Sequence, residues 1–265
     1  MPETITSTTN ERVKKLLKLR EKKERESSGL TIIEGEREIL RALEAGVEVM
    51  ELYRCGKADA ATVRRIEEKI KIGKGALIDV APRVFERIAY GERKEGLLAV
   101  ARIKNKSLKD LKLKTPALIL VLEGVEKPGN LGAVLRTCDA AAVDGVILTE
   151  AATDLYNPNT IRSSLGTIFT VNVFQSNNKE AHDFLKKNKV TILATSPEAG
   201  VAYAQQDLKK PLAVILGSED AGLSDFWLKS ADIRACIPMK GAVDSLNVST
   251  SAAVVLYEAI RQRSA

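Results

Sequence analysis

Six short runs of Val, Ile, Leu and Ala mark the second half of the chain and constrain its fold more than any other feature. They are ALILVLEGV (117–125), GVILTE (145–150), IFTVNVF (168–174), KVTILAT (189–195), PLAVILG (211–217) and DIRACIPM (232–239). Most of them are apolar at nearly every position rather than at alternate positions, and helix-length segments separate them. Strands of a parallel sheet have this pattern because helices cover both faces of the sheet. The sequence therefore predicts a parallel α/β domain over residues 117–265.

The first hundred residues predict a second, smaller α/β domain. Their patterns indicate helices at 11–26, 37–46 and 60–72 and strands at 30–35, 47–55, 76–80 and 97–103. The stretch KNKSLKDLKLKTP that follows has five lysines, one acid and no sustained apolar pattern. We therefore expect an N-terminal domain over 1–105, a lysine-rich linker over 106–116 and a C-terminal domain over 117–265.

The charge of the chain is unevenly distributed. The net charge is +6, but residues 1–116 have 27 Lys and Arg against 19 Asp and Glu, whereas residues 117–265 have 14 against 16. An N-terminal part that meets a polyanion such as RNA would explain this asymmetry. Ordinary solvated lysines on helix surfaces would explain it as well.

Several absences narrow the chemistry. Cys55, Cys138 and Cys236 lack CxxC spacing, so we expect buried thiols rather than disulfides or a metal site. No apolar run reaches the ~18 residues of a membrane span, and the N-terminus lacks a signal-peptide pattern, so we expect a cytoplasmic protein. The only histidine, His182, lies in a polar segment and offers no base for a Ser-His-Asp mechanism. Group transfer from an activated donor is favoured over hydrolysis or redox chemistry.

Three loops follow strands and are rich in polar residues and glycine: EGVEKPGNLGAVLR (123–136), LGSEDAGLS (216–224) and IPMKGAVDSLNVSTSAA (237–253). Ligands of parallel sheets bind beyond the carboxyl ends of the strands, where such loops lie. The first loop has neither GxGxxG nor GxxxxGK[ST], so neither a dinucleotide fold nor a P-loop is expected. Arg136 shares a helix face with Gly132, where it either reaches solvent or holds an anionic group.

Taken together and in this order, the three loops resemble the motifs of the SpoU (TrmH) branch of the SPOUT methyltransferases. The matching stretches are NLGAVLRTCDAAAVDGVIL, LGSEDAGLS and IPMKGAVDSLNVSTSAAVVLYE. Each motif alone is weak, but the combination is specific and covers residues 117–262. The segment TNERVKKLLKLREKKERESSGLTIIEGEREI also resembles the start of the substrate-binding domain of ribosomal-RNA members.

The resemblance implies a fold, a cofactor and a set of site residues. The fold is a parallel sheet with a deep trefoil knot, in a homodimer that binds RNA, and the methyl donor is S-adenosylmethionine. The cofactor-contacting residues carried over are Gly217, Ile237 and Leu246, with Thr195, Leu216 and Met239 as further candidates. The catalytic candidates are Arg136, Asn130, Glu219, Ser245 and Asn247. Arg162 and Ser163 are the candidate RNA contacts, although the usual RxSxGA of the family reads RSSLGT here.

The expected function is methylation of a ribose 2′-hydroxyl in RNA, with 23S ribosomal RNA as the expected substrate. Transfer RNA is an alternative substrate, and an RNA-binding protein of the same fold without methyl transfer is an alternative function. The resemblance gives Arg136 the role of the base that removes the hydroxyl proton. Its guanidinium could instead stabilise negative charge, since a group with a pKa above ~12 is a poor base.

Overall fold

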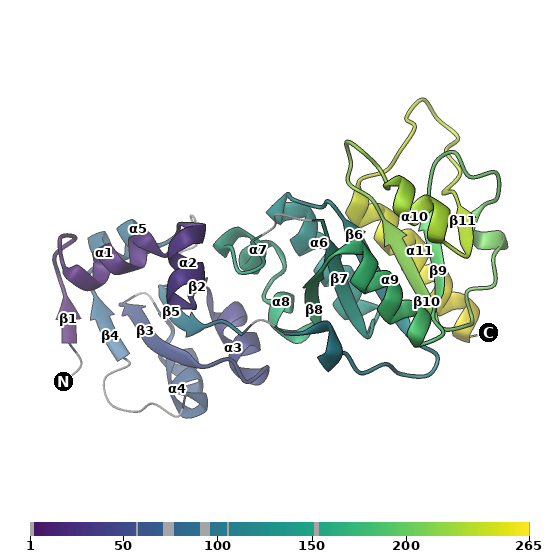
Figure 1. Ribbon diagram of the computed structural model, residues 1–265. Coiled ribbons are helices and arrows are strands. Elements are labelled where there is room, and N and C mark those ends of the chain that lie inside the picture. Colours follow the sequence, from purple (N-terminus) through teal and green to yellow (C-terminus); the bar gives the residue numbers. More distant parts are fainter. Residues whose placement is uncertain are drawn as a thin grey trace. The chain divides into compact units, whose positions relative to one another are not determined.

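The computed structural model describes residues 3–56, 58–70, 77–90, 96–104, 106–150 and 154–264 (Figure 1). Its contacts divide the chain into two compact units. The first unit comprises Met1–Lys104 together with Asp154–Thr170, and the second comprises Asn105–Thr153 and Val171–Ala265. The first unit thus contains a short later segment, Asp154–Thr170, in addition to the N-terminal residues.

The first unit is built on a mixed five-stranded sheet in the order β1-β4-β3-β5-β2. The strands are β1 (Glu3–Ile5), β2 (Leu30–Glu34), β3 (Val49–Cys55), β4 (Leu77–Val80) and β5 (Leu97–Arg102). Its helices are α1 (Glu11–Lys18), α2 (Lys22–Ser28), α3 (Glu36–Glu44), α4 (Ala60–Lys69), α5 (Pro82–Ile88), α7 (Pro158–Ser163) and α8 (Thr167–Thr170). One core lies where α1 and α5 pack on the sheet through residues such as Val13, Leu16 and Phe85.

Two expectations for single elements are wrong. The predicted helix 11–26 is two helices, and the break frees the Leu19 carbonyl to accept a hydrogen bond of 2.5 Å from Arg25 Nη1. The predicted strand 168–174 begins with helix α8 instead, where the Thr167 hydroxyl donates to the Ser164 carbonyl at 2.8 Å. The strand itself, β8 (Val173–Ser176), starts later. Apolar runs alone cannot distinguish a buried strand from a buried helical turn.

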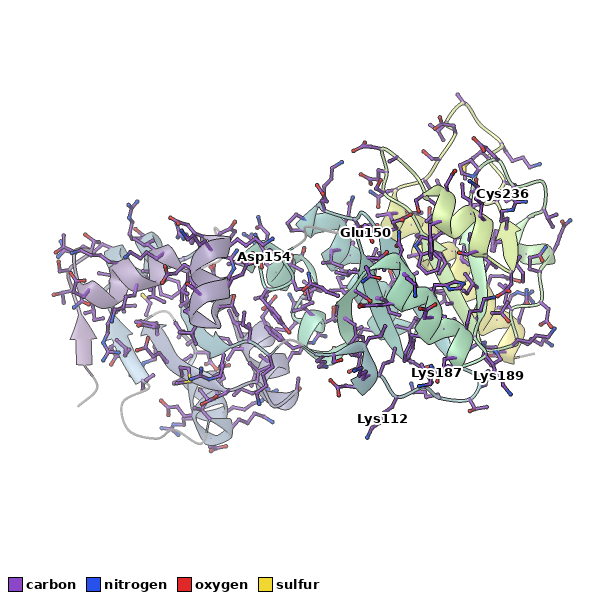
Figure 2. All side chains as sticks on the ribbon, in the orientation of Figure 1. Lys112, Glu150, Asp154, Lys187, Lys189 and Cys236 are labelled. Carbon is purple, nitrogen blue, oxygen red and sulfur yellow. The ribbon has the colours of Figure 1, made fainter. Side chains whose placement is uncertain are left out.

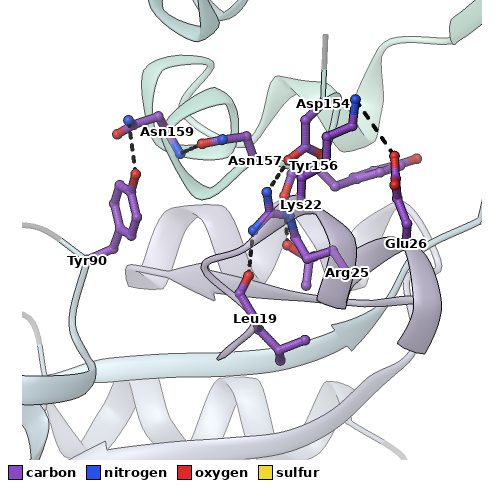
Figure 3. A network of polar contacts seen from close by, with 10 residues as sticks. Leu19, Lys22, Arg25, Glu26, Tyr90, Asp154, Tyr156, Asn157 and Asn159 are labelled. Atoms are coloured by element: carbon purple, nitrogen blue, oxygen red, sulfur yellow. Dashed lines mark hydrogen bonds and ion pairs between the residues drawn. The ribbon is translucent and has the colours of Figure 1, made fainter. Parts of the chain in front are cut away.

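The segment Asp154–Thr170 is tied to the N-terminal residues by polar side chains (Figure 3). Arg25, only 1% exposed, forms an ion pair with Asp154. The Thr31 hydroxyl donates to the Tyr156 carbonyl at 2.8 Å, and Arg41 Nη1 donates to the Leu165 carbonyl at 2.6 Å. Asp154 and these carbonyls are therefore held as parts of the first unit, although they come after strand β7 (Gly145–Thr149) of the second unit in the sequence.

The second unit is a six-stranded sheet in the order β11-β9-β10-β6-β7-β8, in which every pair of strands is parallel. The remaining strands are β6 (Leu118–Glu123), β7 (Gly145–Thr149), β9 (Thr191–Thr195), β10 (Leu212–Leu216) and β11 (Ile233–Ala235). The unit also contains α6 (Pro128–Ala140), α9 (Asn178–Lys187), α10 (Asp225–Ser230), α11 (Val248–Ser264) and the 3-10 turns η1 (Leu108–Asp110) and η2 (Tyr203–Gln205). The predicted parallel sheet is confirmed.

Helices cover both faces of this sheet (Figure 1). On one face, Ala181 and Leu185 of α9 and Trp227 of α10 pack with Ile119 and Val121 of β6. On the other face α6 packs against α11, and α11 also contacts β10. Burial on both sides explains why the strands are apolar at successive positions.

The lysine-rich segment 106–116 contributes to the core of the second unit. Leu111 is 7% exposed, and Leu108 and Leu113 pack against the same cluster. A side chain at Gly145 would begin 2.9 Å from Leu111 Cδ1, so this leucine fills the space that glycine leaves. The segment is charged on its surface but anchored by its leucines.

The three cysteines differ in exposure. Cys55 and Cys138 are buried, as expected, and burial raises the pKa of the Cys138 thiol. Cys236, which directly follows β11, is only partly buried (Figure 2). No helix in the described part of the chain is long and apolar enough to cross a bilayer.

Replacing Arg25 with alanine should destabilise the protein strongly, because it leaves the Asp154 carboxylate without its cation in a largely buried place. Breaking a buried pair costs about 3–5 kcal/mol, which urea unfolding can measure. The matched control is Arg54→Ala, which removes an ion pair with Asp79 whose side chains are 31% and 28% exposed. Exposed pairs contribute about 0.2–1 kcal/mol. Equal losses in both variants would contradict an anchoring role for Arg25.

Candidate active site

The order of the strands fixes where a ligand site can form. From β6 the chain adds β7 and then β8 on one side, whereas β10, β9 and β11 lie on the other side. In parallel sheets a ligand crevice is expected where the chain continues in opposite directions from two adjacent strands, and the carboxyl ends of β6 and β10 are such a place. The loops at these two strand ends contain Asn130 and Glu219, two of the predicted catalytic residues.

The loop after β6 enters α6 with a proline at the first position of the helix. Lys127 is the N-cap residue, and Pro128 begins the helix, where its missing N–H has no cost. Asn130 lies in the first turn of this helix. Arg136 lies further along the same helix and is exposed.

The loop after β10 is folded back on itself at two glycines. The Gly222 N–H donates to the Ser218 carbonyl at 3.0 Å, and the Ala221 N–H donates to Ser218 Oγ at 3.2 Å. A Cβ at Gly217 would lie 2.1 Å from the carbonyl carbon and oxygen of Gly222, so no other residue fits at this position. Gly222 itself has a φ of 66°. This tight turn presents Glu219 at its tip.

The third loop ends in Asn247, just before α11. Its Oδ1 accepts hydrogen bonds from the Ser249 N–H at 2.9 Å and the Ser249 hydroxyl at 2.6 Å. These bonds leave its Nδ2 as the free donor end of the amide. Nδ2 donates to Asn130 Oδ1 at 3.2 Å and to Glu219 Oε1. Asn247 thus joins all three polar loops.

Lys127 completes this network, and the sequence analysis missed it. Its Nζ donates to Glu219 Oε2 at 3.0 Å. The Lys127 ammonium holds the pKa of Glu219 below its usual value of 4.5, and hydrogen bonds from Asn130 and from the Val248 N–H act in the same direction. The only sequence signal was the position of a lysine immediately before Pro128 in one loop, with acids in another.

Two predicted catalytic residues lie outside the network. Arg136 has no side-chain hydrogen bond to any other residue within the described ranges, so neither Asn130 nor Glu219 holds it. Ser245 is exposed, and its hydroxyl forms a hydrogen bond of 3.2 Å with the neighbouring Asp244 and with no other described residue. Asn130, Glu219 and Asn247 are brought together, whereas Arg136 and Ser245 are left free to meet a ligand.

The candidate RNA contacts belong to the first unit. Arg162 and Ser163 lie on α7, within the segment Asp154–Thr170. Arg162 is partly exposed, while the Ser163 hydroxyl donates to the Asn159 carbonyl at 2.7 Å. Arg162 therefore has an available side chain, and Ser163 already has a backbone partner.

The cofactor candidates lie at the carboxyl ends of three neighbouring strands. Thr195 ends β9, Leu216 ends β10 and Gly217 follows it, and Ile237 and Met239 follow β11, which pairs with β9. Ile237, Met239 and Leu246 are partly exposed apolar side chains, and Thr195 Oγ1 donates to the Ile215 carbonyl at 3.0 Å. Apolar side chains beside loop backbone suit a ligand with a flat base and polar edges, as in S-adenosylmethionine.

Comparison with known proteins identifies the family. The profile of the SpoU rRNA Methylase family matches residues 117–257, and that of the MRM3-like substrate binding domain matches residues 10–99. The chain belongs to the SpoU rRNA methylase family. The predicted family and methyltransferase fold are confirmed, while the knot remains a prediction.

Similar proteins align with nearly the whole length of this chain. The 23S rRNA (guanosine(2553)-2′-O)-methyltransferase of Bacillus subtilis is 30% identical over 96% of this chain and 97% of its own. A solved RNA 2′-O ribose methyltransferase has a TM-score of 0.87 at 40% identity, covering 99% of this chain and 100% of that one. The AdoMet-bound rRNA methyltransferase from Sinorhizobium meliloti has a TM-score of 0.89 at 28% identity, covering 98% and 97%.

These matches confirm the prediction of an S-adenosylmethionine-dependent RNA 2′-O-methyltransferase. The roles of individual residues and the division into domains at 105 and 116 remain predictions.

Replacing Lys127 with alanine should raise the pKa of Glu219 towards its usual value, because Lys127 is the largest cause of the depression. The stabilisation from a lowered carboxyl pKa is present above about pH 4.5 and is lost as the pH falls through the lower, folded-state value. The variant should therefore lose its Glu219 network at a higher pH than the wild type. Carbon NMR titration of the glutamate carboxyls would measure both pKa values.

Lys179→Ala is the matched control, since Lys179 lowers the pKa of Asp183 through an exposed ion pair on α9. It should leave the titration of Glu219 unchanged. An unaltered Glu219 pKa in Lys127→Ala would contradict the contact between the two loops.

Proposed function

We propose that this chain transfers the methyl group of S-adenosylmethionine to a ribose 2′-hydroxyl of 23S ribosomal RNA. The observation that carries the proposal is the network in which Asn247 and Glu219 join the loops that follow β6 and β10 and the loop that precedes α11. Relatives named as 23S rRNA methyltransferases align over nearly the full chain, including the region that matches a substrate-binding domain. The positive excess of residues 1–116 supports an RNA-binding role for that region.

The cofactor would lie against the carboxyl ends of β9, β10 and β11. Ile237, Met239 and Leu246 would cover the faces of the adenine, and the backbone around Leu216 and Gly217 would bond its edge, with Thr195 beside them. When bound, S-adenosylmethionine supplies a methyl group on a positively charged sulfur. The residues of the chain then have to align the ribose hydroxyl with that group and exclude competing positions.

Arg136 would act on the RNA by electrostatic stabilisation. An exposed guanidinium without a partner can approach a phosphate and the oxygen on which negative charge develops. It donates up to five hydrogen bonds and remains protonated, so it is suited to holding charge and not to taking a proton. Asn130 and Asn247 would shape the site through Glu219, and Ser245 would contact the ribose. Arg162 would grip a phosphate next to the target.

One assay separates this function from its alternatives. The protein is incubated with labelled S-adenosylmethionine and either ribosomal or transfer RNA, and 2′-O-methyl positions are mapped. Label in ribosomal RNA is expected. Label confined to transfer RNA would show that transfer RNA is the substrate. Binding of RNA without label would show that the chain is an RNA-binding protein of this fold without methyl transfer.

In the same assay, Arg136→Ala should lower the rate by about 10²-fold or more, since loss of one charge-stabilising donor costs this much in other enzymes. Its affinity for S-adenosylmethionine, measured by calorimetry, should stay near that of the wild type, because within the described ranges Arg136 forms no hydrogen bond with a cofactor candidate. Arg136→Lys keeps the charge without the planar fork and should recover part of the rate. A large loss of cofactor affinity in Arg136→Ala would show that the arginine lies in the cofactor site.

We also propose a homodimer located in the cytoplasm. On α11 the large side chain of Tyr257 is 49% exposed, and the apolar Val254 and Ile260 beside it on the helix are partly exposed. A second copy of the chain would cover this face. Sedimentation should give a mass near twice 28.8 kDa, and Tyr257→Asp should shift it to the mass of one chain. A wild-type protein that sediments as a monomer would refute the dimer.

A further inference from the structure

A buried carboxylate lies directly beneath the glycine turn after β10. Glu123 is the last residue of β6 and is 6% exposed. Its Oε2 accepts a hydrogen bond of 2.7 Å from the Ser224 N–H, and its Oε1 accepts bonds of 2.6 Å from the Ser224 hydroxyl and from Asn178 Nδ2. Across the described ranges, no lysine or arginine forms an ion pair with it. A buried charge without a counter-ion depends on such hydrogen bonds.

The orientation of every partner is fixed by a further contact. The indole of Trp227, which is 0% exposed, donates to Asn178 Oδ1 at 2.7 Å. Because an indole N–H can only donate, the oxygen of the Asn178 amide must face Trp227 and its NH2 group must face Glu123. The backbone N–H of Ser224 can also only donate. Both oxygens of Glu123 therefore meet groups that can only donate, the Asn178 NH2 group and the Ser224 N–H.

These contacts fix one end of the turn that contains Glu219. The turn begins at Gly217, whose Cα is packed against the backbone of Gly222, and it ends at Ser224. Ser224 is also the N-cap residue of α10, but its hydroxyl is used on Glu123 and makes no capping bond within the helix. The Glu123 carboxylate thus links the end of β6 to the end of the turn that follows β10.

We propose that Glu123 is a positioning residue for methyl transfer, which holds the Gly217–Ser224 turn in the shape that binds S-adenosylmethionine. The inference rests on the proposed function, because that function assigns Gly217 and its neighbours to the cofactor. Glu123 acts through Ser224 and does not touch the cofactor. Without it, the turn loses its attachment at Ser224, and the spacing between the Gly217 backbone and Glu219 is less firmly fixed.

Glu123→Gln tests this role with almost no change in volume. Whichever way the new amide turns, its NH2 group faces either the Ser224 N–H or the Asn178 NH2, so one donor loses its acceptor. We expect the dissociation constant for S-adenosylmethionine, measured by calorimetry, to rise about tenfold, as for the loss of one hydrogen bond to a charged group. In steady-state assays KM for the cofactor should rise by a similar factor, with kcat within about threefold of the wild type.

Asp144→Asn is the matched control for loss of a buried carboxylate. Asp144 is 5% exposed and lies just before β7. Its carboxylate accepts a hydrogen bond of 2.9 Å from the N–H of Leu118, at the amino end of β6. The Asp144→Asn variant should change the melting temperature but keep the affinity for the cofactor within about twofold of the wild type. Equal weakening in both variants would overturn the proposal, as would wild-type affinity in Glu123→Gln.

A second pair of variants decides the matter if Glu123→Gln does not fold. Ser224→Ala removes the hydroxyl bond alone and should weaken cofactor binding about threefold, whereas Ser224→Thr keeps a hydroxyl and should restore it. Equal dissociation constants for the alanine and threonine variants would overturn the proposal. If the wild type binds S-adenosylmethionine but methylates no RNA, the proposed function is refuted. The role of Glu123 in cofactor binding is then still tested by the dissociation constants.

Discussion

The adjacency of β6 and β10 is the constraint on which the candidate site depends. Both strands run in the same direction and pair along five residues, so their carboxyl ends lie side by side. The chain then diverges, towards β7 from one strand and towards α10 from the other. Neither loop could reach the other without this pairing, since Lys127 and Glu219 are far apart in the sequence. Two carboxylates then connect the loops that follow these strands. Glu219 connects them at the exposed surface, and the buried Glu123 connects the end of β6 to Ser224.

The assignment of Asp154–Thr170 to the first unit changes how RNA recognition is divided along the chain. Arg162 was expected to act from the methyltransferase domain, but the segment that holds it is fastened to residues of α2, β2 and α3. A Cβ at Gly166 would lie 3.0 Å from Glu38 Cα, so this close backbone approach also requires a glycine. The proposed phosphate contact of Arg162 therefore belongs to the unit that matches the substrate-binding domain. The proposed RNA contacts are then divided between the two units, with Arg162 in the first and Arg136 in the second.

The sequence predicted the parallel sheet well because burial on both faces leaves a strong pattern in β6, β7, β9 and β10. The prediction from sequence failed where burial and local backbone geometry favour different structures. Ile168 and Phe169 are as apolar as strand residues, but they pack as a helical turn after Gly166 in the first unit. Leu111 looked like part of a linker because lysines surround it. A single buried leucine in a charged segment has no periodicity that could reveal its contact with Gly145.

For the site, the sequence predicted identities better than contacts. Asn130, Glu219 and Asn247 were expected from the motifs, and they do meet. Lys127 and Glu123 were missed because an ion pair across two loops, and a carboxylate at a strand end, depend on strand order that no local pattern contains. In the sequence, Glu123 lies near the end of an apolar run and begins a polar loop, where an acid is usually solvated. Its burial becomes understandable only with Asn178 and Trp227, which come from two helices on the same face.

The contrast between Arg136 and the other site residues suggests how the work is divided. Glu219, Asn247 and Lys127 satisfy one another, so the loops that would hold the cofactor need no ligand to keep their arrangement. A preorganised pocket loses little entropy when it binds. Among the described residues Arg136 has no such partner, and its charge is exposed, as the proposed contact with RNA requires. A residue that stabilises charge only in the transition state should be unpaired beforehand, because a bond to Glu219 would have to be broken before it could act.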